Sequence, residues 1–561
     1  MDNQRLFLYG SFFFVLFLIW TNWQEEQAPQ QPTTEISQPA DSIPGSSSQP
    51  GSAGSAEVPD VAAVAADDEA ATTEEKVEPT VAPKGRQVHV RTDVLDLVIN
   101  TQGADIVHAE LLDYPVEKGS DEPVELLSNE DGRLYVTQSG LRSSRGAAAP
   151  DHRNIYSAEA DEFRLADNDD SLQVVFTWTG DDGLAVEKIY RFERGEYEIA
   201  MEYRVVNNSG AEWRGDSYLQ LKKRQMSQER SLFDPTSFSY VGPAIYDGES
   251  YEKLDLEDIA NDPLNRTTDG GWIAMLQHYF LAAALPPSET RNVFYAGVIE
   301  RDTYRAGFVQ PAQTVAPDSE TRFHQRLYLG PKLQDHLAEV APKLELSVDY
   351  GVLTIIAEPL FSLLDLIHGW IGNWGWAIII VTILIKLLFY KLSEASGKSM
   401  AKMRKLQPKL QALKERYADD REALNKAMMQ LYQKEKINPF LGCLPILIQL
   451  PVFIALYWVL LESVELRQAP FMLWLNDLSS PDPFYILPVL MGIAMWGQMR
   501  LNPQPPDPIQ AKIMMLMPLM MVAFAVIMPS GLVLYWVVNT VLTAAQQWQI
   551  NRVIDKQGLR H

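Results

Sequence analysis

Apolar and polar residues alternate through much of the first two thirds of the chain, with turn-forming sequences such as Asp181-Asp182-Gly183 between the alternating runs. A period of two is typical of strands that bury one face. We therefore predict many antiparallel strands, packed as a β-sandwich domain over residues 85–349. The clearest runs are Leu172, Val174, Phe176 and Trp178, and then Ile199, Met201, Tyr203 and Val205.

Beyond this domain the alternation gives way to long apolar runs, which are typical of membrane spans. We expect five transmembrane helices in a core spanning residues 373–561. Before them, residues 350–372 are amphipathic and carry Glu358, Asp365 and His368, so we expect an interfacial helix there. The five runs lie at about 374–392, 440–461, 484–498, 512–528 and 530–549.

The N-terminus places Arg5 before an apolar run that ends near Trp20 and Trp23. We interpret residues 1–23 as an N-terminal transmembrane anchor, because no small-residue cleavage site follows; a cleaved signal peptide is the alternative. Residues 24–84 are rich in Pro, Ser, Gln, Ala and acidic residues and nearly lack large apolar side chains. This composition predicts a disordered tether.

Charge is divided as unevenly as hydrophobicity. Residues 24–349 hold 28 Lys and Arg against 58 Asp and Glu, whereas the rest of the chain holds 20 against 15. This division argues against nucleic acid as the main partner and indicates a protein shared between two compartments. Cys443 is the single cysteine, so no intrachain disulfide supports the β domain.

The short loops predict an orientation, because basic residues gather on the cytoplasmic side. Residues 391–436 contain 12 basic against 6 acidic residues, whereas residues 462–482 contain one Arg against four acids. The C-terminal tail, 550–561, is also net basic. An arrangement of six spans, with both termini in the cytoplasm and the β domain outside, agrees with the charge of every loop.

The basic segment itself, 393–437, shows two apolar stripes at helical spacing. Such stripes pair as an antiparallel helical hairpin, which the orientation places in the cytoplasm. The stripes are Met403, Leu406, Leu410 and Leu413, and then Leu424, Met428 and Leu431.

Lys386 lies inside the apolar run at 374–392. A charge at the bilayer centre costs roughly 2.5 to 3.5 kcal/mol on insertion scales, so Lys386 should face a bundle interior or a hydrated cavity. The alternative is that its flexible side chain reaches the headgroups near Lys391.

Further polar residues in the apolar runs complete a candidate groove. Thr382 shares a helix face with Lys386, although a hydrogen bond to its own helix is an equal alternative. The amide of Gln449 needs a hydrogen-bond partner within the membrane. The alternative to a role in the groove is that this hydrogen bond only joins two helices. In the last run, one stripe at helical spacing suits a water-accessible groove; it consists of Tyr535, Trp536, Asn539, Thr543, Gln546 and Gln547. The candidate groove residues are Lys386, Thr382, Gln449, Tyr535, Trp536 and Asn539.

No pattern predicts catalysis, a metal or a cofactor: the chain shows neither a phosphate-binding Gly loop nor Cys and His at metal-ligand spacing. We therefore expect a protein that is not an enzyme and has no small-molecule substrate. Two rival classes stay open. A transporter or channel could use Lys386 for an anionic solute. A sugar-processing enzyme would need a His and Glu site, for which His278 and His324 are the loosest of candidates.

Several stretches of the C-terminal third resemble the YidC-type insertases, which are related to the Oxa-type proteins. These stretches follow in order from about residue 350 to residue 549. They include Met400-Ala401-Lys402-Met403, Asn438-Pro439, Gly442-Cys443-Leu444-Pro445, Gln449-Leu450-Pro451, 463–471, 482–488 and 529–536. The anchor, tether and β domain resemble the Gram-negative form of this family.

The resemblance implies a periplasmic β-supersandwich, similar to sugar-mutarotase folds, on a five-helix core in the bacterial inner membrane. It also implies a groove with one basic residue that attracts the tail of a nascent membrane protein, with the Sec translocon, the ribosome and the lipid bilayer as partners. Lys386 matches that position, where many relatives have Arg, so a bidentate guanidinium role is in doubt. The chain stops at His561 without the long basic tail of some relatives.

Overall fold

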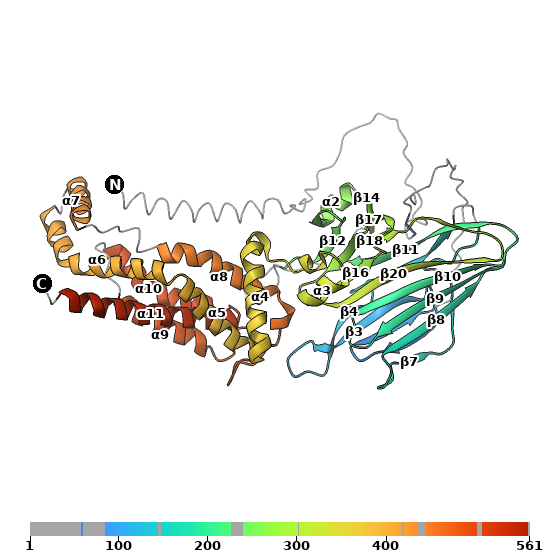
Figure 1. The fold of residues 1–561 in the computed structure, drawn as a ribbon, viewed down its shortest axis with the longest axis horizontal. Coiled ribbons are helices and arrows are strands. Elements are labelled where there is room, and N and C mark those ends of the chain that lie inside the picture. The colour runs from blue at the N-terminus through green and yellow to red at the C-terminus, as the bar shows by residue number, and fades with distance from the viewer. Residues whose placement is uncertain are drawn as a thin grey trace, which may run out of the picture.

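The computed structural model describes residues 58–59, 85–143, 147–225, 239–300, 302–417, 420–435, 444–501 and 508–558. These residues form a β domain and a helical region that lie end to end (Figure 1). The predicted anchor, 1–23, lies outside the described residues, as does the predicted tether, 24–84, apart from Val58 and Pro59. Val58 packs on the β domain beside Tyr218 and Tyr295.

The β domain contains three sheets. The five-stranded sheet has the order β4-β3-β2-β1-β7, and the nine-stranded sheet has the order β13-β12-β15-β16-β20-β10-β9-β8-β6. The six-stranded sheet has the order β14-β17-β18-β11-β19, with β5 paired to β11. The strands are β1 (Gln87–Arg91), β2 (Leu95–Asn100), β3 (Asp105–Pro115), β4 (Pro123–Leu127), β5 (Tyr135–Ser143), β6 (Ser157–Ala158), β7 (Glu162–Arg164), β8 (Ser171–Thr179), β9 (Leu184–Glu193), β10 (Glu198–Asn207), β11 (Trp213–Arg224), β12 (Gly242–Tyr246), β13 (Tyr251–Lys253), β14 (Leu264–Asp269), β15 (Trp272–Leu276), β16 (Phe280–Leu285), β17 (Arg291–Glu300), β18 (Thr303–Val309), β19 (Gln313–Val315) and β20 (Ser319–Pro331).

The alternating sequence runs form strands as predicted. In β8, Val174 and Phe176 are buried while Gln173 and Thr177 are exposed, as a half-buried strand requires. The following turn reaches β9 through Gly183, whose φ of 94° is accessible to glycine at little cost. The domain is therefore a layered, mainly antiparallel β structure with an apolar core between its sheets, β1 and β7 being paired in parallel.

One ion pair lies fully inside this core. Lys188 of β9 has no exposed surface, and its Nζ donates to Asp105 Oδ1 and to Gly103 O, each at 2.8 Å. The same Asp105 oxygen accepts the backbone N–H of Ser139 at 3.0 Å. A buried charge is tolerated when it is paired and hydrogen-bonded in this way. The pair fixes the β2–β3 turn against β9.

The helical region follows the β domain. In Figure 1, α4 runs across the direction of the other long helices and stands between them and the β domain. The helices are α2 (Leu256–Asn261) and α3 (Gln334–Val340) in the β domain, and then α4 (Thr354–Ile371), α5 (Trp374–Leu388), α6 (Tyr390–Arg416), α7 (Arg421–Lys434), α8 (Leu444–Glu462), α9 (Ile486–Leu501), α10 (Pro508–Ala525) and α11 (Ser530–Gly558), with short 3₁₀ turns at Leu344–Ser347, Gly351–Leu353 and Val464–Leu466.

The apolar run at 374–392 is not one straight helix. It breaks at Phe389, where α5 and α6 meet at an angle of 68°. Beyond the break, α6 and α7 pack on each other through Leu406 and Leu410, with Met428 and Leu431 beside them. The two predicted stripes therefore meet in one small apolar cluster.

Among the described helices, α4 alone is long and apolar enough to cross a membrane unaided, and the bent pair α5 and α6 would count as a second span. Shorter apolar helices are Leu447–Glu462, Ile486–Leu501 and Lys512–Ala525. The two regions differ more sharply in how many large apolar side chains they expose than in the lengths of their helices. Among the described residues, four large exposed apolar side chains lie in the β domain, and all the others lie between Ile355 and Val553.

The two regions meet at a junction built on the C-terminal end of α8, near Glu462, which is called its outer end below. Arg467 donates to Pro115 O at 2.7 Å, and Gln468 Nε2 donates to the same oxygen at 3.0 Å. Lys118 of the β3–β4 loop donates to Gln468 O at 2.7 Å. Val464 belongs to the apolar core of the β domain. The segment after α8 is thus held by the β domain on several sides.

Glu465 is a largely buried titratable group in this junction. Its Oε1 accepts the backbone N–H of Gln334 at 3.1 Å, while Oε2 is buried and has no hydrogen-bond partner among the described residues. Burial, together with the charges of Asp365 on α4 and Asp335 on α3, raises the pKa of Glu465 to about 7. The other titratable groups that face it are Tyr114, Tyr328 and Tyr350.

We predict that the junction tightens as pH falls. Separation of the two regions would return Glu465 to water and to a pKa near 4.5, so docking takes up a proton between about pH 7 and pH 4.5. Ionisation above pH 7 costs the docked state up to roughly 3 kcal/mol. Distances between one spin label on the β domain and one on α9, measured from pH 5 to pH 8, should show more docked protein at the acidic end.

Glu465→Gln should weaken this pH dependence, because burial also raises the pKa of Glu462 at the same junction, whereas the exposed Glu339→Gln on α3 should keep it unchanged. Distances in the unsubstituted protein that do not change over this pH range would contradict the prediction.

Candidate functional site

The site begins with the last turn of α5. Asn373 caps the start of this helix, its side chain accepting the N–H of Trp376 at 3.1 Å. Lys386 lies near the other end, one turn before the break at Phe389. Its Nζ donates to Thr543 Oγ1 of α11 at 2.7 Å. The lysine therefore points into the bundle rather than along the helix to an outer surface.

A second polar contact joins α8 to α11. Gln449 Nε2 donates to Asn539 Oδ1, and it lies 3.4 Å from the hydroxyl of Tyr535. Thr543 in turn donates to the backbone carbonyl of Asn539 at 2.6 Å. Since Tyr535, Asn539 and Thr543 are four residues apart, they share one face of α11. That face carries both the Lys386 and the Gln449 contact.

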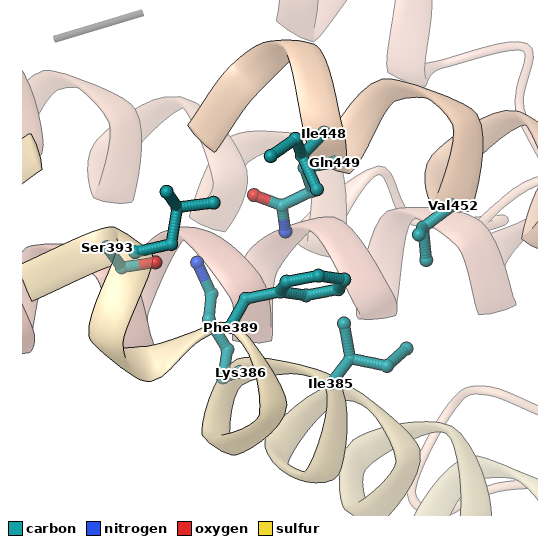
Figure 2. A pocket seen from close by; sticks show the side chains of 8 residues that line it. Ile385, Lys386, Phe389, Ser393, Ile448, Gln449 and Val452 are labelled. Carbon is teal, nitrogen blue, oxygen red and sulfur yellow. The ribbon is translucent and has the colours of Figure 1, made fainter. Parts of the chain in front are cut away.

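A cavity lies between α8 and the bend from α5 to α6, where Figure 2 shows the Lys386 amine and the Gln449 amide pointing toward the same space. The cavity measures about 20 Å³, enough for roughly one water molecule. Its lining is apolar apart from the lysine, the glutamine and Ser393. The lining residues are Ile385, Lys386, Phe389, Leu392, Ser393, Ile448, Gln449 and Val452.

The charge of Lys386 is the main electrostatic feature of this site. Within the described part of the chain, no carboxylate lies within 4.0 Å of its amine. Among the described residues, the neutral hydroxyl of Thr543 accepts a hydrogen bond from it. A cation held this way in apolar surroundings attracts an anionic or polar group strongly.

The structure brings together four of the six candidate groove residues, namely Lys386, Gln449, Tyr535 and Asn539. The Thr382 hydroxyl donates instead to Ile378 O of its own helix at 2.7 Å, which is the alternative left open for it. The Trp536 ring packs on Phe453, with centroids 4.9 Å apart.

Sequence reasoning left out two contributors to the site. Thr543 belongs to the predicted polar stripe and could have been chosen from its spacing. Ser393 lies beyond the break after α5, and no Gly or Pro marks that break in the sequence. Its place in the cavity lining could therefore not be predicted.

The two histidines considered for sugar chemistry are far apart. The β16–β20 pairing runs from Phe280 opposite Pro331 to Leu285 opposite Arg326. His278 lies just outside the first end of this pairing and His324 beyond the second. No group of three or more His, Cys, Asp or Glu in the described residues could hold a metal ion.

Comparisons with known proteins address the whole chain. The family described as the YidC periplasmic domain matches residues 87–363, and that described as the 60Kd inner membrane protein matches residues 366–557. A solved structure, "Active YidC insertase crystal structure with the first transmembrane domain resolved", aligns with a TM-score of 0.38 and 17% identity over 82% of this chain and 94% of that one. Sequence relatives, which are far more similar to this chain, show the family.

Two relatives carry the description "Membrane protein insertase YidC". The protein from Thioalkalivibrio sulfidiphilus is 49% identical over 100% of both chains. The protein from Nitrosococcus oceani is 46% identical over 100% of both chains. The chain therefore belongs to the YidC family of membrane protein insertases.

Proposed function

We propose that this protein inserts other proteins into the bacterial inner membrane and assists their folding and assembly there, without covalent chemistry. The observation that carries the proposal is the cluster on one face of α11, where Thr543 binds the amine of Lys386 and Tyr535 and Asn539 bind Gln449; among the described residues no carboxylate pairs with this lysine. The transporter alternative has no separate observation in its favour.

In this mechanism Lys386 attracts the polar or acidic tail of an incoming chain. The hydroxyl and amide groups of Thr543, Gln449 and Asn539 replace part of the water that the tail loses, which lowers the barrier to its crossing. The apolar segment that follows moves into lipid beside the apolar helices, driven by hydrophobic transfer. Because the cavity holds about one water, α8 must move away from α5 before a chain can enter.

For the membrane arrangement we propose an anchor at 1–23, a tether at 24–84 and an interfacial helix at 350–372, followed by five spans in 373–561. The charged side of α4, with Glu358, Asp365 and His368, favours the interface over a crossing. The broad apolar surface between Ile355 and Val553 supports contact of this region with lipid. Basic loops favour a cytoplasmic position for both termini and a periplasmic β domain.

The hairpin at 393–437 is our candidate for contact with the ribosome, because its excess of Lys and Arg suits ribosomal RNA or anionic headgroups. We further propose that the protein acts either alone or together with the Sec translocon. Nascent membrane proteins are the clients in either case.

Depletion of the protein in its host tests the central proposal. Insertion of a small two-span test protein, measured by protease protection, should fail on depletion and return with a plasmid copy. The test protein should carry an acidic N-terminal tail, because that tail is what Lys386 is proposed to attract. Undiminished insertion of several such proteins after depletion would refute the insertase function and favour the transporter.

A further inference from the structure

The outer end of α8 is completed by a residue of the β domain. The last four carbonyls of a helix have no donor within it, and they need partners from elsewhere. Ser463 N donates to Val459 O at 3.2 Å. Leu461 O lies 2.8 Å from Nε2 of His278, which belongs to the turn between β15 and β16. Since a carbonyl only accepts, Nε2 of His278 carries the proton.

His278 is well suited to hold this position. Its turn is closed by Gln277 N, which donates to Phe280 O at 2.9 Å. The Tyr279 ring stacks on the imidazole with centroids 3.8 Å apart. The strands on both sides are buried along their whole length. The imidazole is therefore part of the rigid β domain rather than a mobile surface group.

The two residues after Leu461 are held in the same way. Glu462, buried at 4% side-chain exposure, accepts the hydroxyl of Ser239 at 2.7 Å. Ser463 Oγ lies 3.0 Å from the hydroxyl of Tyr350. Three consecutive residues at the outer end of α8 thus have side-chain partners outside the helix.

We propose that His278 is a positioning residue for the groove, acting through α8. The helix that ends on His278 also presents Gln449 to α11, about 18 Å away at 1.5 Å per residue. A fixed outer end limits rotation and sliding of α8, and so keeps Gln449 opposite Tyr535 and Asn539. Pro451 lies between the two ends and has no amide hydrogen to give, so the effect on Gln449 is partial. The inference rests on the proposed function of the groove.

The geometry is tested first, in the full-length protein in liposomes. Cysteines at Gln449 and Asn539, in a Cys443→Ser background, report the α8–α11 contact by their rate of disulfide formation. His278→Ala should slow this rate by roughly threefold or more, as expected for loss of one hydrogen bond. His278→Gln, whose amide can still donate to Leu461 O, should restore the rate. His324→Ala is the matched control, because that histidine is exposed on β20.

Insertion is measured separately, with the same His278 variants and without the added cysteines. A slower disulfide rate together with slower insertion for His278→Ala, both restored by glutamine, supports the proposal. An unchanged disulfide rate overturns it, and so does a slower rate with normal insertion. Should His278→Ala fail to fold, Ser239→Ala gives a second test of the same end of α8, because it removes the hydroxyl that Glu462 accepts: a slower disulfide rate supports the proposal and an unchanged rate overturns it. If the unsubstituted protein inserts nothing, the proposed function fails, while the disulfide rate still reports the contact.

Discussion

Lys386→Glu is expected to abolish insertion of proteins with acidic tails, while Lys386→Arg keeps most of it. Two charges about 4 Å apart at an effective dielectric of about 20 interact by about 4 kcal/mol, so a change from attraction to repulsion slows insertion by at least roughly a hundredfold. Lys386→Ala should fall between the two. Rescue of a depleted host, with protease protection of a two-span protein, measures the series.

Lys391 provides the matched control for this series. It lies five residues further along, and its side chain is 93% exposed. Lys391→Glu makes the same change of charge outside the cavity and should leave insertion nearly normal. Full rescue by all the Lys386 variants would mean that the lysine only reaches toward headgroups and that its charge does not act on clients.

Lys188→Met is expected to destabilise the β domain by about 3 to 5 kcal/mol, because it leaves Asp105 buried without its partner. Lys188→Met together with Asp105→Asn should recover part of this loss, since an amide is less costly to bury than a carboxylate. Pulse proteolysis of the full-length protein in detergent, over a urea series, reports unfolding of the β domain.

Arg204→Met serves as the comparison for this ion pair. Arg204 forms ion pairs with Glu320 and Glu187, but all three side chains are more than a third exposed. Exposed pairs contribute about 1 kcal/mol or less, so this variant should unfold at nearly the original urea concentration. Equal losses for Arg204→Met and Lys188→Met would show that burial does not set the contribution of the core pair.

Where residues repeat with a regular period, the sequence was a sufficient guide. The alternation in β8 and β10 predicted most of the buried side chains, because a strand turns each successive residue to the opposite face; Leu172 and Trp178 are only partly buried, and Glu202 is buried on the other face. The spacing of Tyr535 and Asn539 predicted a common face of α11 in the same way. Lys386 stood out because a charge in an apolar run needs a polar neighbour.

Features that depend on contacts between distant segments were not predictable. Nothing near Lys386 indicates that Thr543, on another helix, accepts a hydrogen bond from its amine. The break at Phe389 has no Gly or Pro to announce it. His278 drew attention as a possible catalytic group, whereas its position against Leu461 depends on how the β domain docks on α8. Such outcomes are decided by packing between elements, which a local pattern does not encode.

The narrow space beside Lys386 also bears on whether water and ions can pass through this site. In the arrangement proposed above, a cavity with room for about one water is too small to hold a file of water molecules beside Lys386. Any wetting must arise while a client holds α5 and α8 apart, and must end when the client leaves. On the proposed mechanism, the space beside Lys386 would therefore become wet only while a client occupies it.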